Sequence, residues 1–495
     1  DIRGGISVCD LNNDGQLDLL FGGYDDKIHV WDPVANELLP GWPVDLGYNS
    51  LSEPVLADLD DIIKIYDRSW IVDLARHQIA IARELIKSGE HNTKSLDIAE
   101  AVRESVKRLI QPLPRQVINA TGVVIHTNLG RSPLSRESIE SINQAAIGYS
   151  DLELNLFNGR RGSRQAHVQD LLSQLTGAEA SIVVNNNASA ILLGLSALAS
   201  GRSVVVSRGE AVEIGGGFRI PDVLLQSGAE LTEVGTTNRT YIRDYENAMS
   251  DNTGAFLKAH ASNFRVEGFT ASVEPQELVE LGSRHGIPVL HDVGSGCFLN
   301  TEDYGMAHEP TPQESVRAGV GLTFFSGDKL LGGPQSGIVV GTRNLITALE
   351  RHPLARAVRI DKLSLASLTT TLQHYLLNES EKKIPIWRMI SASSEDIKGR
   401  AHLWQYGLEV QSTVIPSRSP IGGGSLPGET LPSWVLAIRC DGKEGGPDKV
   451  LDNLRRSDKP VIARIADEQI LLDPRTVLPE QDVDLKQSLK WALSN

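Results

Sequence analysis

The chain has 495 residues, of which 40% are hydrophobic and 22% are charged, and its formal net charge at pH 7 is −15. This length allows two or three domains with a sizeable core. No stretch approaches the roughly 18 apolar residues of a membrane span, and the overall acidity argues against a general nucleic-acid-binding protein.

Targeting and redox features favour the cytoplasm. The opening "DIRGG" lacks a basic region followed by an apolar one, so a signal peptide is either absent or was lost with a missing start, since the chain does not begin with Met. Cys9, Cys297 and Cys440 are far apart and form no metal-binding or disulfide pattern, which fits a reducing compartment.

The first sixty residues contain 2 basic and 12 acidic side chains, a net charge of −10, and so carry most of the chain's net charge of −15. Short apolar runs alternate there with glycine turns, a pattern typical of β-hairpins. Asp10, Asn12, Asp14 and Asp18 have a spacing that suits Ca²⁺, but Phe21 stands where an EF-hand needs glutamate. The segment resembles one blade of an FG-GAP or integrin-type propeller. One repeat cannot bury its own faces, so we predict a fused fragment or artefact, with calcium binding as the weaker interpretation.

Residues 61–115 predict a small helical region. Apolar side chains recur at helical spacing from Ile71 to Leu85 and again from Ile98 to Leu109. The region contains 10 basic and 8 acidic side chains, which allows a local basic face, although solvated helix charge is the simpler interpretation. The prolines of "QPLPR" mark its end.

Residues 116–345 alternate strand-like and helix-like segments, and continuous apolar strands of this kind indicate a mostly parallel sheet covered on both faces. The expected strands are "SIVV" (181–184), "SVVV" (203–206), "AFLKA" (255–259), "PVLHD" (288–292), "LTFF" (322–325) and "GIVVG" (337–341). Residues 346–495 predict a smaller α+β domain that contains the glycine-rich loop "SPIGGGSLPGETLPS".

Polar groups follow several of these strands, at the edge where α/β sheets bind ligands. "NNNASA" (185–190) opens a helix whose N-terminus suits a phosphate, and Asn187 and Ala188 lie in its first turn. Asp292 and Lys329 end two other strands. Pyridoxal 5'-phosphate needs a lysine for its covalent link and an aspartate for its pyridine nitrogen. Ser326 offers a hydroxyl to the phosphate, and the glycines at 332–333 are expected to let the backbone pass close to the cofactor.

Taken singly, these signals are weak, because a lysine after a strand is usually a solvated loop residue. The sequences of longer motifs are more specific. "INATGVVIHTNLGRSPLS", "VVNNNASAILLGLSA", "EVGTTNRT", "HDVGSG", "FFSGDKLLGGPQSGIVVG" and "HPLARAVRIDKL" occur in this order. From about residue 67 onwards the chain closely resembles bacterial selenocysteine synthase, the L-seryl-tRNA(Sec) selenium transferase family.

The resemblance implies a fold type I pyridoxal phosphate enzyme. It would convert seryl-tRNA(Sec) to selenocysteinyl-tRNA(Sec) with selenophosphate, by β-elimination through aminoacrylyl-tRNA and then selenium addition. By motif, Lys329 would bind the cofactor and act as the base, with a pKa lowered by burial and by the cationic site. Asp328 precedes it in the same motif and is a further catalytic candidate. Arg131, Arg356 and Arg359 match the family's active-site arginines, which suit an oxyanion.

The resemblance also implies a homodecamer with active sites at dimer interfaces and a helical N-terminal domain that grips the tRNA. Here the first part of that domain is replaced by the propeller-like segment. Gly217 stands where the family commonly has serine or alanine. Two alternatives remain: a related pyridoxal phosphate lyase acting on a small amino acid or amino sugar, and a calcium-dependent adhesion module based on residues 10–18 alone.

Overall fold

The structure is a computed structural model, and it describes residues 6–9, 15–22, 25, 27–45, 59–88, 98–214, 217–440 and 445–494. Contacts divide the chain into two compact units, residues 1–115 and residues 116–495. Within the described ranges, no helix combines the length and hydrophobicity that crossing a membrane requires.

The first unit contains a small antiparallel sheet and a separate helical cluster. Leu20, Val30 and Leu39 form the buried centre of the sheet, whereas Ile71 and Val102 belong to the helical core. The predicted hairpins and the two predicted helices are therefore both present. The elements are β1 (Ser7–Cys9), β2 (Asp18–Gly22), β3 (Lys27–Asp32), β4 (Glu37–Leu38), β5 (Val44–Asp45), α1 (Asp60–Ile63), α2 (Arg68–Lys87) and α3 (Ile98–Ile110).

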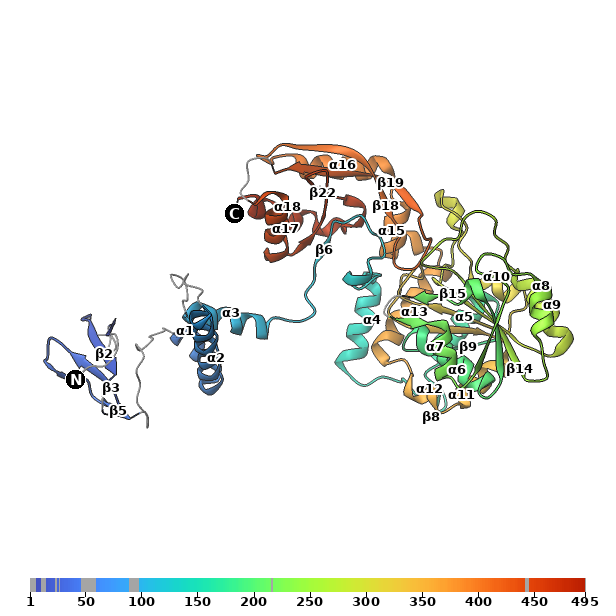
Figure 1. Ribbon diagram of the computed structural model, residues 1–495, viewed down its shortest axis with the longest axis horizontal. Helices are drawn as coiled ribbons and strands as arrows, with labels where there is room; N and C mark the ends of the chain where they lie inside the picture. The colour runs from blue at the N-terminus through green and yellow to red at the C-terminus, as the bar shows by residue number, and fades with distance from the viewer. Residues whose placement is uncertain are drawn as a thin grey trace. The chain divides into compact units, whose positions relative to one another are not determined.

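The second unit is built on a seven-stranded sheet (Figure 1). In spatial order its strands are β13 (Glu230–Val234), β10 (Ser203–Ser207), β14 (Thr253–Ala259), β15 (Val289–Gly294), β16 (Leu322–Ser326), β17 (Gly337–Gly341) and β9 (Ala180–Val184). Neighbouring strands from β13 to β16 pair in parallel, and β17 runs antiparallel to both β16 and β9. This confirms the predicted mostly parallel sheet and adds β13, which the sequence patterns did not indicate.

Successive strand residues point to opposite faces, and each face has its own helical layer. Val204 and Val206 belong to the core under α6 (Asn187–Ala199), α7 (Ile220–Gln226) and α11 (Arg343–Arg351). Val205 lies in the opposite core under α8 (Ile242–Ala248) and α9 (Pro275–His285). On that same side, α5 (Ala166–Thr176) and α13 (Lys362–Leu376) cover the strands nearer β9.

The C-terminal part forms a second layered domain. Its antiparallel sheet has the order β18 (Ser412–Pro420), β19 (Thr430–Arg439), β22 (Gln469–Leu472), β21 (Arg464–Ala466), with α16 (Ser394–Gln405), α17 (Gly446–Arg456) and α18 (Asp482–Ser494) around the core. Strand β6 (Ile118–Asn119) pairs in parallel with β20 (Val461–Ile462), which joins the start of this unit to its end. Because α11 and α13 cover the larger sheet, the predicted domain boundary after residue 345 falls inside a helical layer.

Shorter elements connect these layers. They are α4 (Arg136–Ile147), β7 (Leu154–Asn155), β8 (Arg160–Arg161), β11 (Glu213–Ile214), β12 (Phe218–Arg219), α10 (Pro312–Arg317), α12 (Leu354–Ala357), α14 (Ser380–Lys383) and α15 (Pro385–Ser391).

Candidate active site

Lys329 lies in a tightly held loop directly after β16. Its side chain is only 5% exposed. The loop is closed by a hydrogen bond from Gly327 N–H to the Ser336 carbonyl at 2.9 Å and by one from Gly333 N–H to the Gly327 carbonyl at 2.9 Å. A primary amine is thus fixed at the carboxyl edge of the sheet, out of bulk water.

The glycines at 332 and 333 make close contacts within the protein, and their predicted approach to the cofactor stays a prediction. A Cβ on Gly332 would lie 2.2 Å from Ile384 Cγ2, and one on Gly333 would lie 3.3 Å from Thr371. The close approach is therefore to helical segments of the protein itself. Gly332 also has φ +75°, a backbone conformation that favours glycine. These glycines let the lysine loop pack down on its neighbours.

Burial is the main cause of the shifted pKa of Lys329. It lowers the pKa of the ammonium group, and the nearby Arg131 guanidinium lowers it further, whereas Asp292 and Asp328 oppose the shift. The amine is consequently neutral over a wider pH range than an exposed lysine. Neutral amine is the form that can attack a carbonyl or accept a proton.

Asp292 lies on β15, beside β16, the strand that leads to Lys329, and is 3% exposed. Its Oδ1 accepts hydrogen bonds from Asn187 Nδ2 and from Gly294 N–H, both at 3.0 Å. Burial raises the pKa of this carboxyl, and the Asn187 bond and the Lys329 charge act in the opposite direction. A cationic ligand at Asp292 would satisfy the buried carboxylate.

Helix α6 begins beside this carboxylate. Asn186 caps the helix by accepting a hydrogen bond from Ser189 N–H at 2.9 Å, and Asn187 and Ala188 form its first turn. Ala188 is exposed, so the helix N-terminus is open to a ligand. Ser326 is buried at the end of β16, where it pairs with Gly337. The N-terminus of α6, which is predicted to bind the cofactor phosphate, therefore lies close to the Asp292 carboxylate.

These residues fit pyridoxal phosphate. A lysine amine, a buried carboxylate and an open helix N-terminus are the three groups that the cofactor requires. Asn187 Oδ1 is buried without a hydrogen-bond partner among the described residues. Gly424 leaves free space beside the amine, because a Cβ there would be 3.4 Å from Lys329 Nζ.

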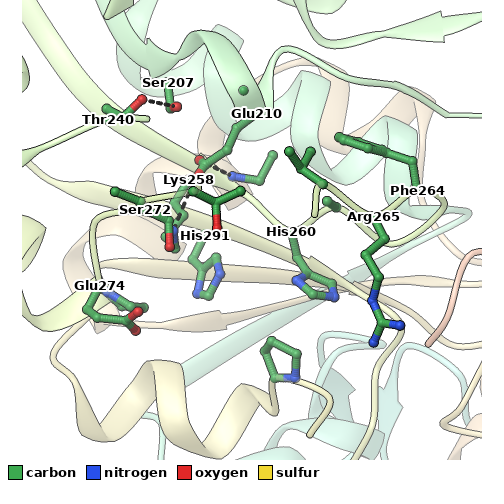
Figure 2. A pocket seen from close by; sticks show the side chains of 18 of the residues that line it. Ser207, Glu210, Thr240, Lys258, His260, Phe264, Arg265, Ser272, Glu274 and His291 are labelled. Carbon is green, nitrogen blue, oxygen red and sulfur yellow. Dashed lines mark hydrogen bonds and ion pairs between the residues drawn. The ribbon is translucent and has the colours of Figure 1, made fainter. Parts of the chain in front are cut away.

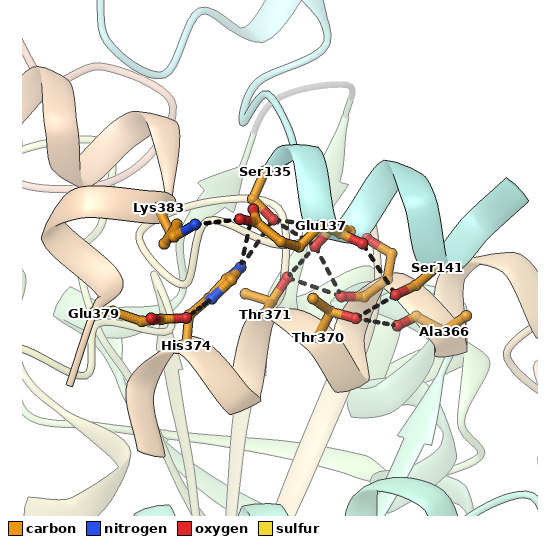
Figure 3. A network of polar contacts seen from close by, with 11 residues as sticks. Ser135, Glu137, Ser141, Ala366, Thr370, Thr371, His374, Glu379 and Lys383 are labelled. Carbon is orange, nitrogen blue, oxygen red and sulfur yellow. Dashed lines mark hydrogen bonds and ion pairs between the residues drawn. The ribbon is translucent and has the colours of Figure 1, made fainter. Parts of the chain in front are cut away.

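Arg131 approaches Lys329 from the segment before α4. Its Nη1 donates to Asp328 Oδ2 at 2.7 Å, and Asp328 is itself buried. The backbone of Arg131 has φ +63°, which is unusual for a residue with a side chain. A network that includes Ser135, Glu137 and His374 then anchors the start of α4 to α13 (Figure 3).

Arg356 and Arg359 do not join this group within the chain. Both are exposed, and the Arg359 guanidinium lies 3.8 Å from Glu153, which also pairs with Arg164 at 2.6 Å. The Arg356 guanidinium has no hydrogen bond or ion pair in the part of the chain that the structure describes. The backbone of Arg359 does pair with Val184, at the end of β9.

The calcium interpretation gains no support. Asp10, Asn12 and Asp14 lie outside the described residues, and Asp18 is a buried residue at the start of β2. The described residues contain no group of three or more His, Cys, Asp or Glu side chains that could hold a metal ion.

The C-terminal domain supplies a wall that the sequence patterns did not place. Residues 422–426, between β18 and β19, pass over Lys329 with Gly424 nearest to the amine. Glu309, 1% exposed, holds this loop by accepting a hydrogen bond from Leu426 N–H at 3.3 Å. Arg265 and Ala307 hold it further along, through Glu429. The sequence signal for this wall was the run of three glycines at 422–424 in the predicted C-terminal domain.

A cavity of about 650 Å³ lies behind this wall (Figure 2). His260, Glu309 and Leu426 line it, whereas Lys329 and Asp292 do not. Lys258 and Glu210 form an ion pair at 3.0 Å in the cavity. Burial, with the nearby Lys258 charge, lowers the pKa of His291 to about 3. The cavity therefore adjoins the lysine site without containing it.

The fold and the geometry of Lys329 and Asp292 define a fold type I enzyme that depends on pyridoxal phosphate. A solved structure of similar fold is D-glucosaminate-6-phosphate ammonia-lyase, with a TM-score of 0.54 and 20% identity, covering 77% of this chain and 96% of that chain. Residues 117–478 match the model of the L-seryl-tRNA selenium transferase family, and the chain belongs to this family.

Curated relatives align with this chain over most of their length. The L-seryl-tRNA(Sec) selenium transferase of Moorella thermoacetica is 50% identical over 386 residues, which are 77% of this chain and 82% of the relative. The protein of the same name from Geobacter metallireducens is 47% identical over 434 residues, or 86% and 93% of the two chains.

Proposed function

We propose that this chain replaces the serine hydroxyl of L-seryl-tRNA(Sec) with selenium from selenophosphate, giving L-selenocysteinyl-tRNA(Sec) and phosphate in the cytoplasm. The observation that carries the proposal is the buried Lys329 amine, with Asp292 on the neighbouring strand β15 and Arg131 bonded to the adjacent Asp328. Relatives that align with 77% and 86% of this chain, at 50% and 47% identity, bear the name of that activity.

Bound pyridoxal phosphate supplies an electron-accepting ring that makes the Cα proton of serine removable. Asp292 holds the proton of the ring nitrogen, and the N-terminus of α6 at Asn187 and Ala188 binds the phosphate, with Ser326 close by. Lys329 removes the Cα proton and later returns it. The hydroxyl takes up a proton and leaves Cβ as water, and the selenium of selenophosphate forms a bond to Cβ. A water molecule then attacks phosphorus, so that the phosphorus–selenium bond breaks and phosphate is released.

Arg131 binds the selenium donor. A guanidinium group presents paired N–H donors that match the oxygens of a phosphate-like anion. Asp328 accepts from Arg131 Nη1 and holds the guanidinium beside Lys329. Arg356 and Arg359, which are exposed within one chain, serve the site of a neighbouring subunit in a homodecamer.

The helical region at residues 61–115 contributes to tRNA binding, and residues 1–60 are an appended segment. The test of this division is to compare the full chain with a variant that lacks residues 1–58. Selenium incorporation at an equal or higher rate in the shortened variant supports it. Loss of tRNA binding, with unchanged cofactor binding, would assign the tRNA contact to the first segment.

The central experiment supplies purified, cofactor-loaded protein with seryl-tRNA(Sec) and radiolabelled selenophosphate and follows label on the tRNA. Arg131→Ala should lose label, whereas Arg136→Ala, at an exposed arginine on α4, should retain it. Turnover of free serine or an amino sugar without labelling of the tRNA would favour a small-molecule lyase instead.

A further inference from the structure

Ser262 is a buried hydroxyl that the reaction described above does not use. It lies three residues beyond β14 and is 1% exposed. Its Oγ has no hydrogen-bond partner among the described residues, although its own N–H donates to the His260 carbonyl at 2.9 Å. Buried hydroxyls are nearly always hydrogen-bonded, so an unpartnered one beside a ligand site indicates a missing ligand atom.

Two glycines place Ser262 relative to the reactive amine. A Cβ built on Gly294 would lie 3.6 Å from Ser262 Oγ and 3.8 Å from Lys329 Nζ. A Cβ built on Gly424 would lie 3.7 Å from the same Oγ and 3.4 Å from the same Nζ. Each glycine therefore leaves empty a space that touches both polar atoms.

Three chain segments that are distant in sequence form this space. Ser262 follows β14, Gly294 ends β15, and Gly424 comes from the C-terminal domain. Both glycines have positive φ, +67° and +73°, so side chains are disfavoured there on conformational grounds as well. The arrangement keeps room for a ligand atom between the hydroxyl and the amine.

We propose that Ser262 is a cofactor-binding residue whose hydroxyl donates a hydrogen bond to the phenolic oxygen of pyridoxal phosphate. This oxygen is on the ring carbon next to the one that bears the aldehyde with which Lys329 reacts, so it lies close to Lys329 Nζ. Asp292 holds the opposite side of the ring, at its nitrogen. The inference rests on the cofactor alone and is independent of the selenium donor and of tRNA.

The bond has a measurable consequence for the proton shared between the phenolic oxygen and the lysine nitrogen. A donor at the oxygen withdraws negative charge that otherwise favours protonation of the nitrogen. Removing the donor should therefore move the pH midpoint of the visible cofactor band upwards, by about one unit for one hydrogen bond.

The experiment reconstitutes cofactor-free Ser262→Ala, Ser262→Thr and wild-type protein with pyridoxal phosphate and records absorbance against cofactor concentration and against pH. We expect Ser262→Ala to raise the Kd about tenfold and to raise the midpoint, and Ser262→Thr, which keeps a hydroxyl, to stay near wild type. Ser181→Ala is the matched control, because it removes another buried hydroxyl without a described partner.

Wild-type Kd and midpoint in Ser262→Ala would overturn the proposal. If the only change were a raised KM for seryl-tRNA, Ser262 would contact the substrate and the assignment to the cofactor would be wrong. If Ser262→Ala does not fold, Ser262→Cys decides by the same two measurements. Failure of selenium transfer by wild-type protein would reject the proposed function and leave this spectroscopic result intact.

Discussion

Asn187 provides a sharp test of how the site holds the cofactor. Its Nδ2 donates to Asp292 Oδ1 at 3.0 Å, and Gly294 N–H donates to the same oxygen at the same distance. A hydrogen bond to a charged group contributes about 1.5–3 kcal/mol. Since Gly294 still orients Asp292 in Asn187→Ala, we expect the lower end of that range, a rise of about tenfold in the Kd for pyridoxal phosphate.

Asn187→Asp should be the more damaging change although it is almost isosteric. It replaces the donor by a second carboxylate beside Asp292, and two carboxylates in contact cannot both ionise readily. The Kd of this variant should improve as the pH falls. Cofactor titration followed by visible absorbance measures all variants, and Asn453→Ala, which removes a buried amide bonded to the Ala492 carbonyl, is the control. Tighter binding by Asn187→Asp than by Asn187→Ala would refute the reasoning.

Other variants test single contacts of the same site. Burial lowers the pKa of Lys329 below the ordinary 10.5, so wild-type stability rises with pH between the two values, and Lys329→Met should remove that rise and stabilise the cofactor-free protein in thermal melts at neutral pH. Asp328→Asn should raise the KM for selenophosphate several-fold but leave that for seryl-tRNA unchanged. Gly424→Ala should prevent formation of the visible band, whereas Gly399→Ala, whose Cβ meets no atom within 4 Å, should not.

The sheet was predictable because of how its strands are buried. "SIVV" and "LTFF" correspond to β9 and β16, whose residues are all buried, so apolar side chains occupy consecutive positions. Strand β13 was missed for the opposite reason. It lies at the sheet edge, and its Glu230 and Glu233 are exposed. An edge strand with one covered face does not give a continuous apolar run.

Part of the site was predictable from the same topology. Asp292 lies near the end of β15 and Lys329 follows the neighbouring β16, and the carboxyl ends of parallel strands meet at one edge. The resemblance placed Arg131 and Asp328 among the site candidates, but their contact was not predicted, because nothing local in "HTNLGR" indicates the partner of Arg131. The packing of Gly332 against the protein itself was not predicted. Its missing side chain makes room for Ile384, a tertiary contact that local sequence does not reveal.

The glycine-rich loop of the C-terminal domain contributes to the lysine site of the larger domain. Gly423 packs against Ile125, so close that a Cβ would lie 2.2 Å from Ile125 Cγ2, and the next residue, Gly424, lies beside Lys329 Nζ. Glu309 fixes the far end of the loop through Leu426 N–H. Contacts from both the larger domain and the C-terminal domain therefore define the space beside the Lys329 amine. Gly423 and Gly424, which have no side chains, therefore shape the space beside the Lys329 amine.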